Sequence, residues 1–162
     1  MSETATLPAA AARVASAAEA QGLAITVRLH AAPTRSAEEA AAACGCDVGQ
    51  IVKSLVFRGA ESNRPDLLLV SGRNRVDEAG VAHELGEALR RPDAADVRAI
   101  TGFAIGGIPP LGHAEPLATL MDRDLLTHAS VWAAAGTPNA VFAIDPARLA
   151  AVTGARVMRL AE

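Results

Sequence analysis

The sequence predicts an α+β fold in which helices pack around a mixed β-sheet. Two short runs, IVKSLVF at 51–57 and LLLV at 67–70, are apolar on both faces of an extended chain, which is typical of central strands covered on two sides. Candidate strands and helices are interspersed but do not alternate strictly, and some connections are short. No G-x-G-x-x-G follows an early strand and no Walker loop occurs, which disfavours a doubly wound parallel sheet.

Most of the predicted helices begin after a capping side chain and end before a glycine. These signals place helices at 9–20, 37–44, 78–85, 94–100, 129–135 and 146–152. Ser36 and Glu39 form the S-x-x-E capping box ahead of the second helix. Asp145 and Pro146 supply an N-cap and a first-turn proline for the last one, and Gly154 follows its end.

Three further strands complete the predicted sheet, at 25–29, 140–144 and 156–160. The first and the last alternate between apolar and polar residues, as half-buried strands do. Since 162 residues is the size of one ordinary domain and no linker or internal repeat is visible, we expect a single domain over residues 1–162.

Charge and composition exclude several classes of protein. Fifteen basic and eighteen acidic residues give a net charge of −3, which argues against a protein that coats nucleic acid. The N-terminal segment carries Glu3 and Glu19 without a cationic leader, and no apolar stretch approaches the roughly 18 residues of a membrane span. We therefore expect a cytoplasmic protein without a signal peptide or a membrane partner.

The usual catalytic and metal-binding patterns are missing from the sequence. There is no H-E-x-x-H or G-x-S-x-G motif, and the four histidines show no metal-ligand spacing, so we expect neither a metal nor a cofactor. Cys44 and Cys46 lack the C-x-x-C spacing of redox and zinc sites. They are interpreted as small apolar side chains, with a metal or redox role as the alternative.

Lys53 is the single lysine among fifteen cationic residues, and it lies in the middle of an apolar strand. An unpaired charge there costs several kcal/mol. Two interpretations stay open: an edge strand with the lysine facing water, or a cation at the rim of a pocket that meets an anionic or carbonyl oxygen of a ligand.

The segment FAIGGIPPLGH at 103–113 cannot be regular structure and is predicted to be a rigid loop. The amides of Gly106 and Gly107 could donate to an oxyanion, or the glycines could simply form a turn. His113 closes this loop and is a better site candidate than the other histidines. A second loop, Gly136-Thr137-Pro138, either lines the same cavity or only joins two elements.

Taken together, five segments resemble the YbaK/ProX superfamily, the free-standing relatives of the editing domain of bacterial prolyl-tRNA synthetases. They are His30 with its following Pro-Thr and capped helix, IVKSLVF, LLLVSGRNRVDEAGVA, TGFAIGGIPPLGH and GTPNAVFAIDPARLAAVTGA. The resemblance covers residues 8–160 in the right order. It implies a partly barrel-like mixed sheet wrapped by helices, and a trans-editing deacylase that hydrolyses the ester bond of mischarged tRNA.

The resemblance also implies roles for individual residues. Lys53 takes the position of the family's functional lysine, while Gly106 and Gly107 take part in catalysis. Substrate binding falls to His30, Ile108, Pro109, Pro110, Gly112, His113, Gly136 and Pro138. The implied partners are the tRNA acceptor end and a prolyl-tRNA synthetase, and the oligomeric state stays open. Some relatives lack a histidine after the loop, so His113 either tunes specificity or is incidental.

Two other functions stay open at this point. The chain could be a non-catalytic module that binds the tRNA acceptor end or a small ligand, or a hydrolase of another small ester. Phosphate contacts could come from a stripe of arginines, or these could be ordinary solvated surface. The stripe comprises Arg73, Arg75, Arg90 and Arg91. A pocket walled by Ala, Val and Ile would suit a small amino acid such as Ala, Ser, Thr or Cys.

Overall fold

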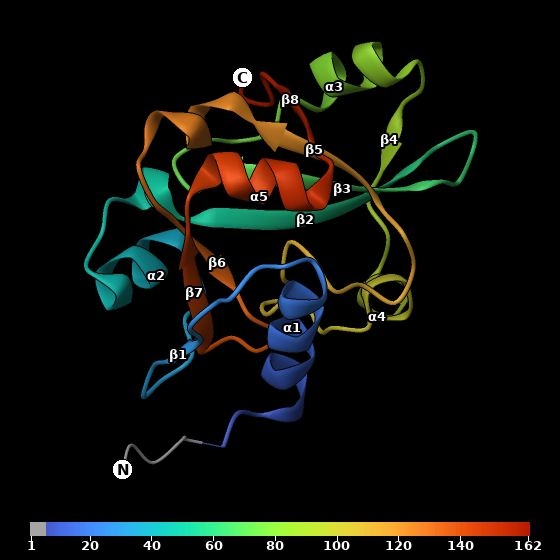
Figure 1. Ribbon diagram of the computed structural model, residues 1–162. Helices are drawn as coiled ribbons and strands as arrows, with labels where there is room; N and C mark the ends of the chain where they lie inside the picture. The colour runs from blue at the N-terminus through green and yellow to red at the C-terminus, as the bar shows by residue number, and fades with distance from the viewer. Residues whose placement is uncertain (1–5) are drawn as a thin grey trace.

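The computed structural model describes residues 6–162 and has the predicted α+β fold, built on two sheets (Figure 1). The larger sheet contains, in spatial order, β4 (Leu89–Arg90), β2 (Val52–Gly59), β3 (Pro65–Ser71), β5 (Ala118–Asp122) and β8 (Arg156–Met158). The smaller sheet contains β1 (Arg28–Leu29), β7 (Ala140–Ile144) and β6 (Val131–Ala134). Residues 1–5, which include Glu3 of the segment expected not to be a signal peptide, lie outside the described residues.

The mixed character of the sheet is confirmed. β2 pairs with β3 antiparallel, whereas β3 with β5 and β5 with β8 are parallel pairs. The two sheets meet where Ile51, just before β2, forms a parallel bridge with Trp132 of β6. Within residues 6–162 the two sheets do not close into a barrel. The predicted barrel-like character is limited to the contact between the sheets at this bridge.

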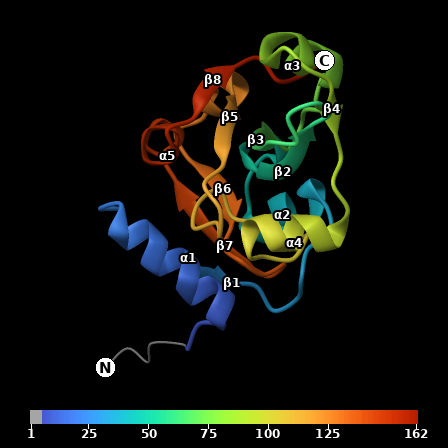
Figure 2. The same ribbon diagram turned by 90° about the vertical axis from the view of Figure 1, so that its right-hand side faces the viewer.

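Within residues 6–162, five α-helices surround the sheets: α1 (Ala9–Ala20), α2 (Ala37–Cys44), α3 (Glu78–Leu85), α4 (Ala94–Thr101) and α5 (Pro146–Thr153). Two 3₁₀ turns, η1 (Val48–Gln50) and η2 (Arg123–Thr127), complete the described elements. The predicted N-caps are confirmed, since Ser36, Asp77, Asp93 and Asp145 each accept a backbone N–H of the first helical turn. Figures 1 and 2 show α1 and α3 on opposite sides of the molecule. No helix within residues 6–162 has the length and apolar character needed to cross a membrane.

The predicted helix at 129–135 is wrong, because this segment contains strand β6. Val131 and Ala133 are buried while Trp132 and Ala134 are partly exposed, which is the period of two of a strand. The strand pairs antiparallel with β7 along its whole length, beginning at Val131 and Ile144. Pairing with a buried neighbour therefore overrides the helix propensity of the alanine run.

The other differences concern strand lengths. The strand predicted at 25–29 is limited to Arg28–Leu29, the two positions at which it pairs with β7. β8 ends at Met158 rather than at residue 160, and strands β4 and β5 were not predicted. Very short strands carry too few residues for a sequence pattern.

Strand β2 divides the core, as its two-sided apolar pattern predicts. Val52 and Val56 belong to the main hydrophobic cluster, which includes side chains of α1, β6 and β7. Leu55 and Phe57 face the second cluster, built from β3, α3 and β5.

One edge of β2 is paired with β3 from Val52 to Arg58. On its other edge, the described strands pair with it only at Arg58 and Gly59, and β6 reaches only Ile51. Between these points the edge of the sheet is open, and this gap is where the candidate site lies.

Candidate functional site

A pocket of about 490 Å³ lies along the open edge of β2. Its walls come from β2 itself, the first residues of α2 with the segment before them, strands β6 and β7, and the loop at 105–108. Segments far apart in the sequence thus converge on the place where the sheet is interrupted.

The pocket has a cationic lining although the chain has a net charge of −3. Three of the residues that line it are basic, namely Arg35, Lys53 and Arg91, and within residues 6–162 no aspartate or glutamate lines it. A concave surface with charge of one sign concentrates counter-ions. The pocket therefore favours a ligand with anionic or strongly polar oxygen atoms.

Lys53 is half-buried at the open edge. Its side chain is neither fully exposed to water, as on an ordinary edge strand, nor enclosed within a continuous sheet. Its Nζ donates a hydrogen bond to the backbone carbonyl of Asn74. Burial lowers the pKa of Lys53 and the charge of Arg75 acts in the same direction, while Glu38 and Asp122 oppose this shift. The ammonium has only one protein acceptor in residues 6–162, which leaves donor capacity for a ligand.

The Asn74 loop that receives Lys53 is fixed by a buried carboxylate. Asp122, at the end of β5, is fully buried. Its Oδ2 accepts hydrogen bonds from Ser71 N at 3.1 Å and from Asn74 Nδ2 at 2.8 Å, and its Oδ1 accepts one from Asp124 N at 3.0 Å. Because a buried carboxylate needs such donors, this network sets the position of the loop and, through it, of Lys53.

The glycine loop forms the opposite side of the pocket. Gly106 and Ile108 line it, and Gly107 lies behind them in contact with the second loop. The Gly107 N–H donates to Ala104 O at 3.2 Å, and its carbonyl accepts from Gly136 N at 2.9 Å. Within residues 6–162 the Gly106 N–H forms no hydrogen bond. Among the described residues the Gly106 amide thus has no acceptor, whereas the Gly107 amide is committed to the turn.

Helix α1 packs against both the glycine loop and the second loop. Gly136 has a φ of 98°, and a Cβ at this position would lie 2.8 Å from the Ala10 carbonyl. A Cβ on Gly112 would lie 3.1 Å from Ala17 Cβ, so this glycine also allows a close approach to α1. Arg13 donates to Gly102 O at 2.9 Å and stacks over the Phe103 ring, with its Cζ 4.6 Å from the centroid.

His113 stabilises the glycine loop from outside the pocket. Its Nε2 lies 2.7 Å from Pro109 O, and burial lowers the pKa of the imidazole, although the Pro109 carbonyl opposes this shift. The neutral ring donates its Nε2–H to that carbonyl and so closes a turn of the loop. Pro109 and Pro110 are both buried beneath the pocket surface.

His30 lies near Cys44 but does not form a catalytic dyad with it. His30 Nε2 is 3.7 Å from Cys44 Sγ. Burial lowers the pKa of His30 and raises the pKa of Cys44 to about 11, so the pair stays as neutral imidazole and thiol. Cys44 packs with Ala41, Ile51 and Val141, as the small apolar interpretation expects. Within residues 6–162 no group of three or more His, Cys, Asp and Glu side chains is arranged to hold a metal ion.

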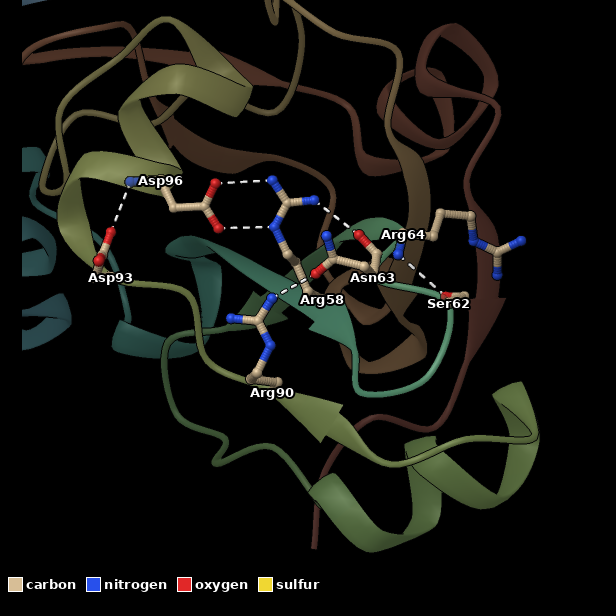
Figure 3. A network of polar contacts seen from close by, with 7 residues as sticks. All are labelled: Arg58, Ser62, Asn63, Arg64, Arg90, Asp93 and Asp96. Carbon is tan, nitrogen blue, oxygen red and sulfur yellow. Dashed lines mark hydrogen bonds and ion pairs between the residues drawn. The ribbon is translucent and has the colours of Figure 1, made fainter.

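A network of polar contacts that includes Arg58 and Arg90 lies next to helix α4 (Figure 3). Arg58 of β2 binds both carboxylate oxygens of Asp96 in α4, at 2.7 and 2.8 Å, and donates to Asn63 O at 2.8 Å. Arg90 donates to Asn63 Oδ1 at 2.5 Å. The network ties the β2–β3 turn to α4, whose Val97 lines the pocket.

Two of the four arginines predicted as a phosphate-binding stripe have protein partners. Arg90 binds Asn63, and Arg91 binds Glu78 at 2.9 Å while stacking over Phe57. Arg73 and Arg75 are exposed on the loop that contains Asn74. The four arginines therefore do not form one stripe: Arg73 and Arg75 lie on the Asn74 loop, and Arg90 and Arg91 lie in and after β4.

Of the predicted site residues, the structure brings four together at the pocket: Lys53, Gly106, Ile108 and Pro138. The others lie outside the lining, namely His30, Gly107, Pro109, Pro110, Gly112, His113 and Gly136. Sequence reasoning missed several polar or aromatic lining residues, which are Thr34, Arg35, Ser36, Ser54 and Trp132. The loop that contains Thr137 was offered as a wall of the cavity, and Thr137 and Pro138 do line it. Ser54 could have been suspected, because it is the second polar residue within the apolar run.

The fold and the site define a class of protein: an α+β domain with a cation-lined ligand pocket on an open sheet edge. The chain belongs to the aminoacyl-tRNA editing domain family, whose pattern matches residues 31–161. This confirms the family predicted from the sequence motifs.

The chain is similar to solved structures and to curated proteins. A "putative trans-editing enzyme for prolyl tRNA synthetase" is 49% identical with a TM-score of 0.92, over 97% of this chain and 99% of that one. The protein APE2540, described as hypothetical, is 29% identical with a TM-score of 0.83, over 90% and 96% of the two chains. Protein YwhH of Bacillus subtilis (strain 168), described as uncharacterized, is 29% identical over 74% of this chain and 76% of its own length.

One curated relative is a much larger synthetase. The proline–tRNA ligase of Limosilactobacillus fermentum is 34% identical over 54% of this chain, and the match covers 16% of the ligase. The similarity is thus to one part of that enzyme.

Proposed function

We propose that the chain is a trans-editing aminoacyl-tRNA deacylase that hydrolyses the ester bond of mischarged tRNA carrying a small amino acid. The observation that carries the proposal is the convergence of Lys53 and the available Gly106 amide on one cation-lined pocket. Membership of the editing family and the likeness to a protein described as a trans-editing enzyme support the same reaction.

The proposed reaction needs no covalent intermediate with the protein. Water adds to the ester carbonyl carbon, the bond from that carbon to the ribose oxygen breaks, and the proton from water passes to the ribose oxygen. The products are a free amino acid and a tRNA with a free terminal hydroxyl. Because an ester is already activated, positioning and stabilisation of the oxyanion account for catalysis without a nucleophilic side chain.

Lys53 and Gly106 have complementary roles in this proposal. The Lys53 ammonium binds a phosphate or carbonyl oxygen of the substrate with the donor capacity that Asn74 leaves unused. The Gly106 N–H donates to the oxyanion that develops on the carbonyl. Gly107 and Gly136 allow the two loops to approach closely enough to place that amide.

The walls of the pocket suit a small amino acid. Val52, Val56, Ala133 and Ala140 line its apolar part. Ile108 and Pro138 are proposed to confine the substrate, and the predicted binding residues outside the lining support the two loops: Pro109, Pro110, Gly112 and His113. His30 has a similar indirect role, since its backbone N–H donates to Asn139 O at 2.8 Å.

The partners follow from the substrate. The proposed partner is the acceptor end of tRNA, and a prolyl-tRNA synthetase is a second partner, by likeness to the ligase relative. We also propose that the chain is a single domain and acts in the cytoplasm, where mischarged tRNA is produced.

Deacylation by Lys53 variants tests the function. Lys53→Ala should lower the turnover of mischarged tRNA relative to the wild type. Lys53→Arg should also have lower turnover than the wild type, because a planar guanidinium does not replace a compact ammonium. Arg148→Ala, which removes an exposed cation of α5, is the matched control and should keep full turnover. Unchanged turnover in both Lys53 variants would refute the assignment. Salt-dependent binding of tRNA without release of amino acid would instead favour a binding module.

A further inference from the structure

Ser54 has a buried hydroxyl group without a partner. Among residues 6–162, its Oγ is the only buried side-chain nitrogen or oxygen that forms no hydrogen bond. Such groups are rare, because burying a hydroxyl without a partner destabilises the folded protein. Ser54 also lines the pocket, so a ligand bound there is a candidate for the missing partner.

The position of Ser54 on β2 places it in the apolar half of the pocket. It lies on the same face of the strand as Val52 and Val56, whereas the neighbouring Lys53 projects from the opposite face. Both residues line the pocket because it follows the open edge. The ammonium and the hydroxyl can therefore contact different parts of one ligand.

We infer that Ser54 is a specificity-determining residue whose hydroxyl forms a hydrogen bond with a polar group of the aminoacyl moiety. This inference rests on the proposed function. The cationic side takes the phosphate or carbonyl oxygens, which leaves the side of Val52 and Val56 for the amino acid. The polar group is either the α-amine, present in every aminoacyl ester, or a hydroxyl or thiol of a small side chain.

A hydroxyl in this place adds selectivity that an apolar wall cannot provide. An apolar pocket distinguishes poorly between side chains that differ by one small group, whereas a site that needs a hydrogen bond rejects a ligand without it. Ser54 is thus the polar residue that would select the ligand within an otherwise apolar subsite.

The experiment compares Ser54→Thr with Ser54→Val, two side chains of the same shape that differ in the hydroxyl group. Both are assayed for deacylation of alanyl-tRNA and seryl-tRNA, with Ser16→Ala on the exposed face of α1 as the control. Ser54→Val should show about tenfold lower kcat/KM than Ser54→Thr, the loss expected for one hydrogen bond to a polar ligand. An equal loss on both substrates identifies the α-amine, and a loss on seryl-tRNA alone identifies the side-chain hydroxyl.

Stability separates this role from a structural one. Since the hydroxyl has no partner among the described residues, Ser54→Val should melt no lower than Ser54→Thr, and a lower melting temperature together with equal activity would overturn the inference. Equal kcat/KM for the two variants on both substrates would also overturn it.

The proposed function can fail separately. If the wild-type chain does not release amino acid from either tRNA, binding of 3′-alanylamido-3′-deoxyadenosine and its seryl counterpart replaces turnover as the readout. About tenfold weaker binding by Ser54→Val than by Ser54→Thr would support the inference. Equal binding, or no binding by the wild-type chain, would overturn it.

Discussion

Replacing Gly107 with alanine tests whether close packing of the two loops shapes the pocket. A Cβ on Gly107 would lie 2.7 Å from the carbonyl carbon and oxygen of Gly136 and from Thr137 Cα. These are backbone atoms, so no side-chain rotation can relieve the contact. Ordinary contact begins near 3.4 Å, and the two loops must therefore separate by about 0.7 Å.

The separation has an energetic and a functional consequence. Overpacking of this kind costs about 1–3 kcal/mol. For a chain of this length we expect Gly107→Ala to lower Tm by about 2–12 °C, from roughly 2–4 °C for each kcal/mol. Gly106 and Ile108 move with the loop, and a displacement approaching 1 Å should lower kcat/KM about tenfold or more.

Thermal unfolding and deacylation of mischarged tRNA measure the two consequences in parallel. Gly49→Ala is the matched control, because its Cβ would meet the His128 ring at 3.2 Å, and that side chain can move. We expect this control to lose less than about 1 kcal/mol and to keep its activity. A Gly107→Ala variant with the Tm and deacylase activity of the control would refute the reasoning.

Three further predictions concern buried polar groups. Asp122→Asn should destabilise the fold by about 1–3 kcal/mol, because the amide cannot accept all the N–H groups that now reach the carboxylate, and it should lower deacylation by loosening Asn74 and Lys53. Urea unfolding checks the first effect, and an equally stable, fully active variant would contradict it. Burial holds the pKa of His113 below its usual 6.5, so unfolding takes up a proton and the stability of the wild type should fall as the pH drops below about 6.5. Unfolding at pH 7.5 and pH 5 should show a smaller loss in His113→Asn, and an identical loss would be evidence against this role. Burial raises the pKa of Cys44 to about 11, so the Cys44 thiol should resist alkylation by iodoacetamide at pH 8, and Cys44→Ala should keep its deacylase activity. Rapid alkylation of Cys44 in the native protein, detected by mass spectrometry, would speak against an inert thiol.

The elements with local signals were predictable from the sequence. Helices α2 to α5 begin at capping side chains whose hydrogen bonds involve only neighbouring residues, so the pattern alone locates them. The two-sided burial of β2 was also predictable, because both of its faces are apolar. β6 was not, since its strand state depends on β7, and alanine by itself favours a helix.

Residues of the candidate site were predictable only where a residue type is unusual in its local sequence. Lys53 and Gly106 were identified because a cation in an apolar strand and paired glycines in a loop are unusual. The contribution of Arg35 and Trp132 depends on which segments meet at the sheet edge, which no local pattern encodes. Gly107 was predicted to take part in catalysis, but its N–H donates to Ala104 O, and its close contact with Gly136 becomes visible only in three dimensions.

The open edge of β2 has a consequence for how this protein can be studied by mutation. An unpaired strand edge presents backbone N–H and C=O groups, and here that edge borders a ligand pocket. Hydrogen bonds to these groups survive every side-chain substitution at residues 52–57. An alanine scan of the strand would therefore report only part of its contribution to binding, and backbone amide-to-ester replacement would be needed to measure the remainder.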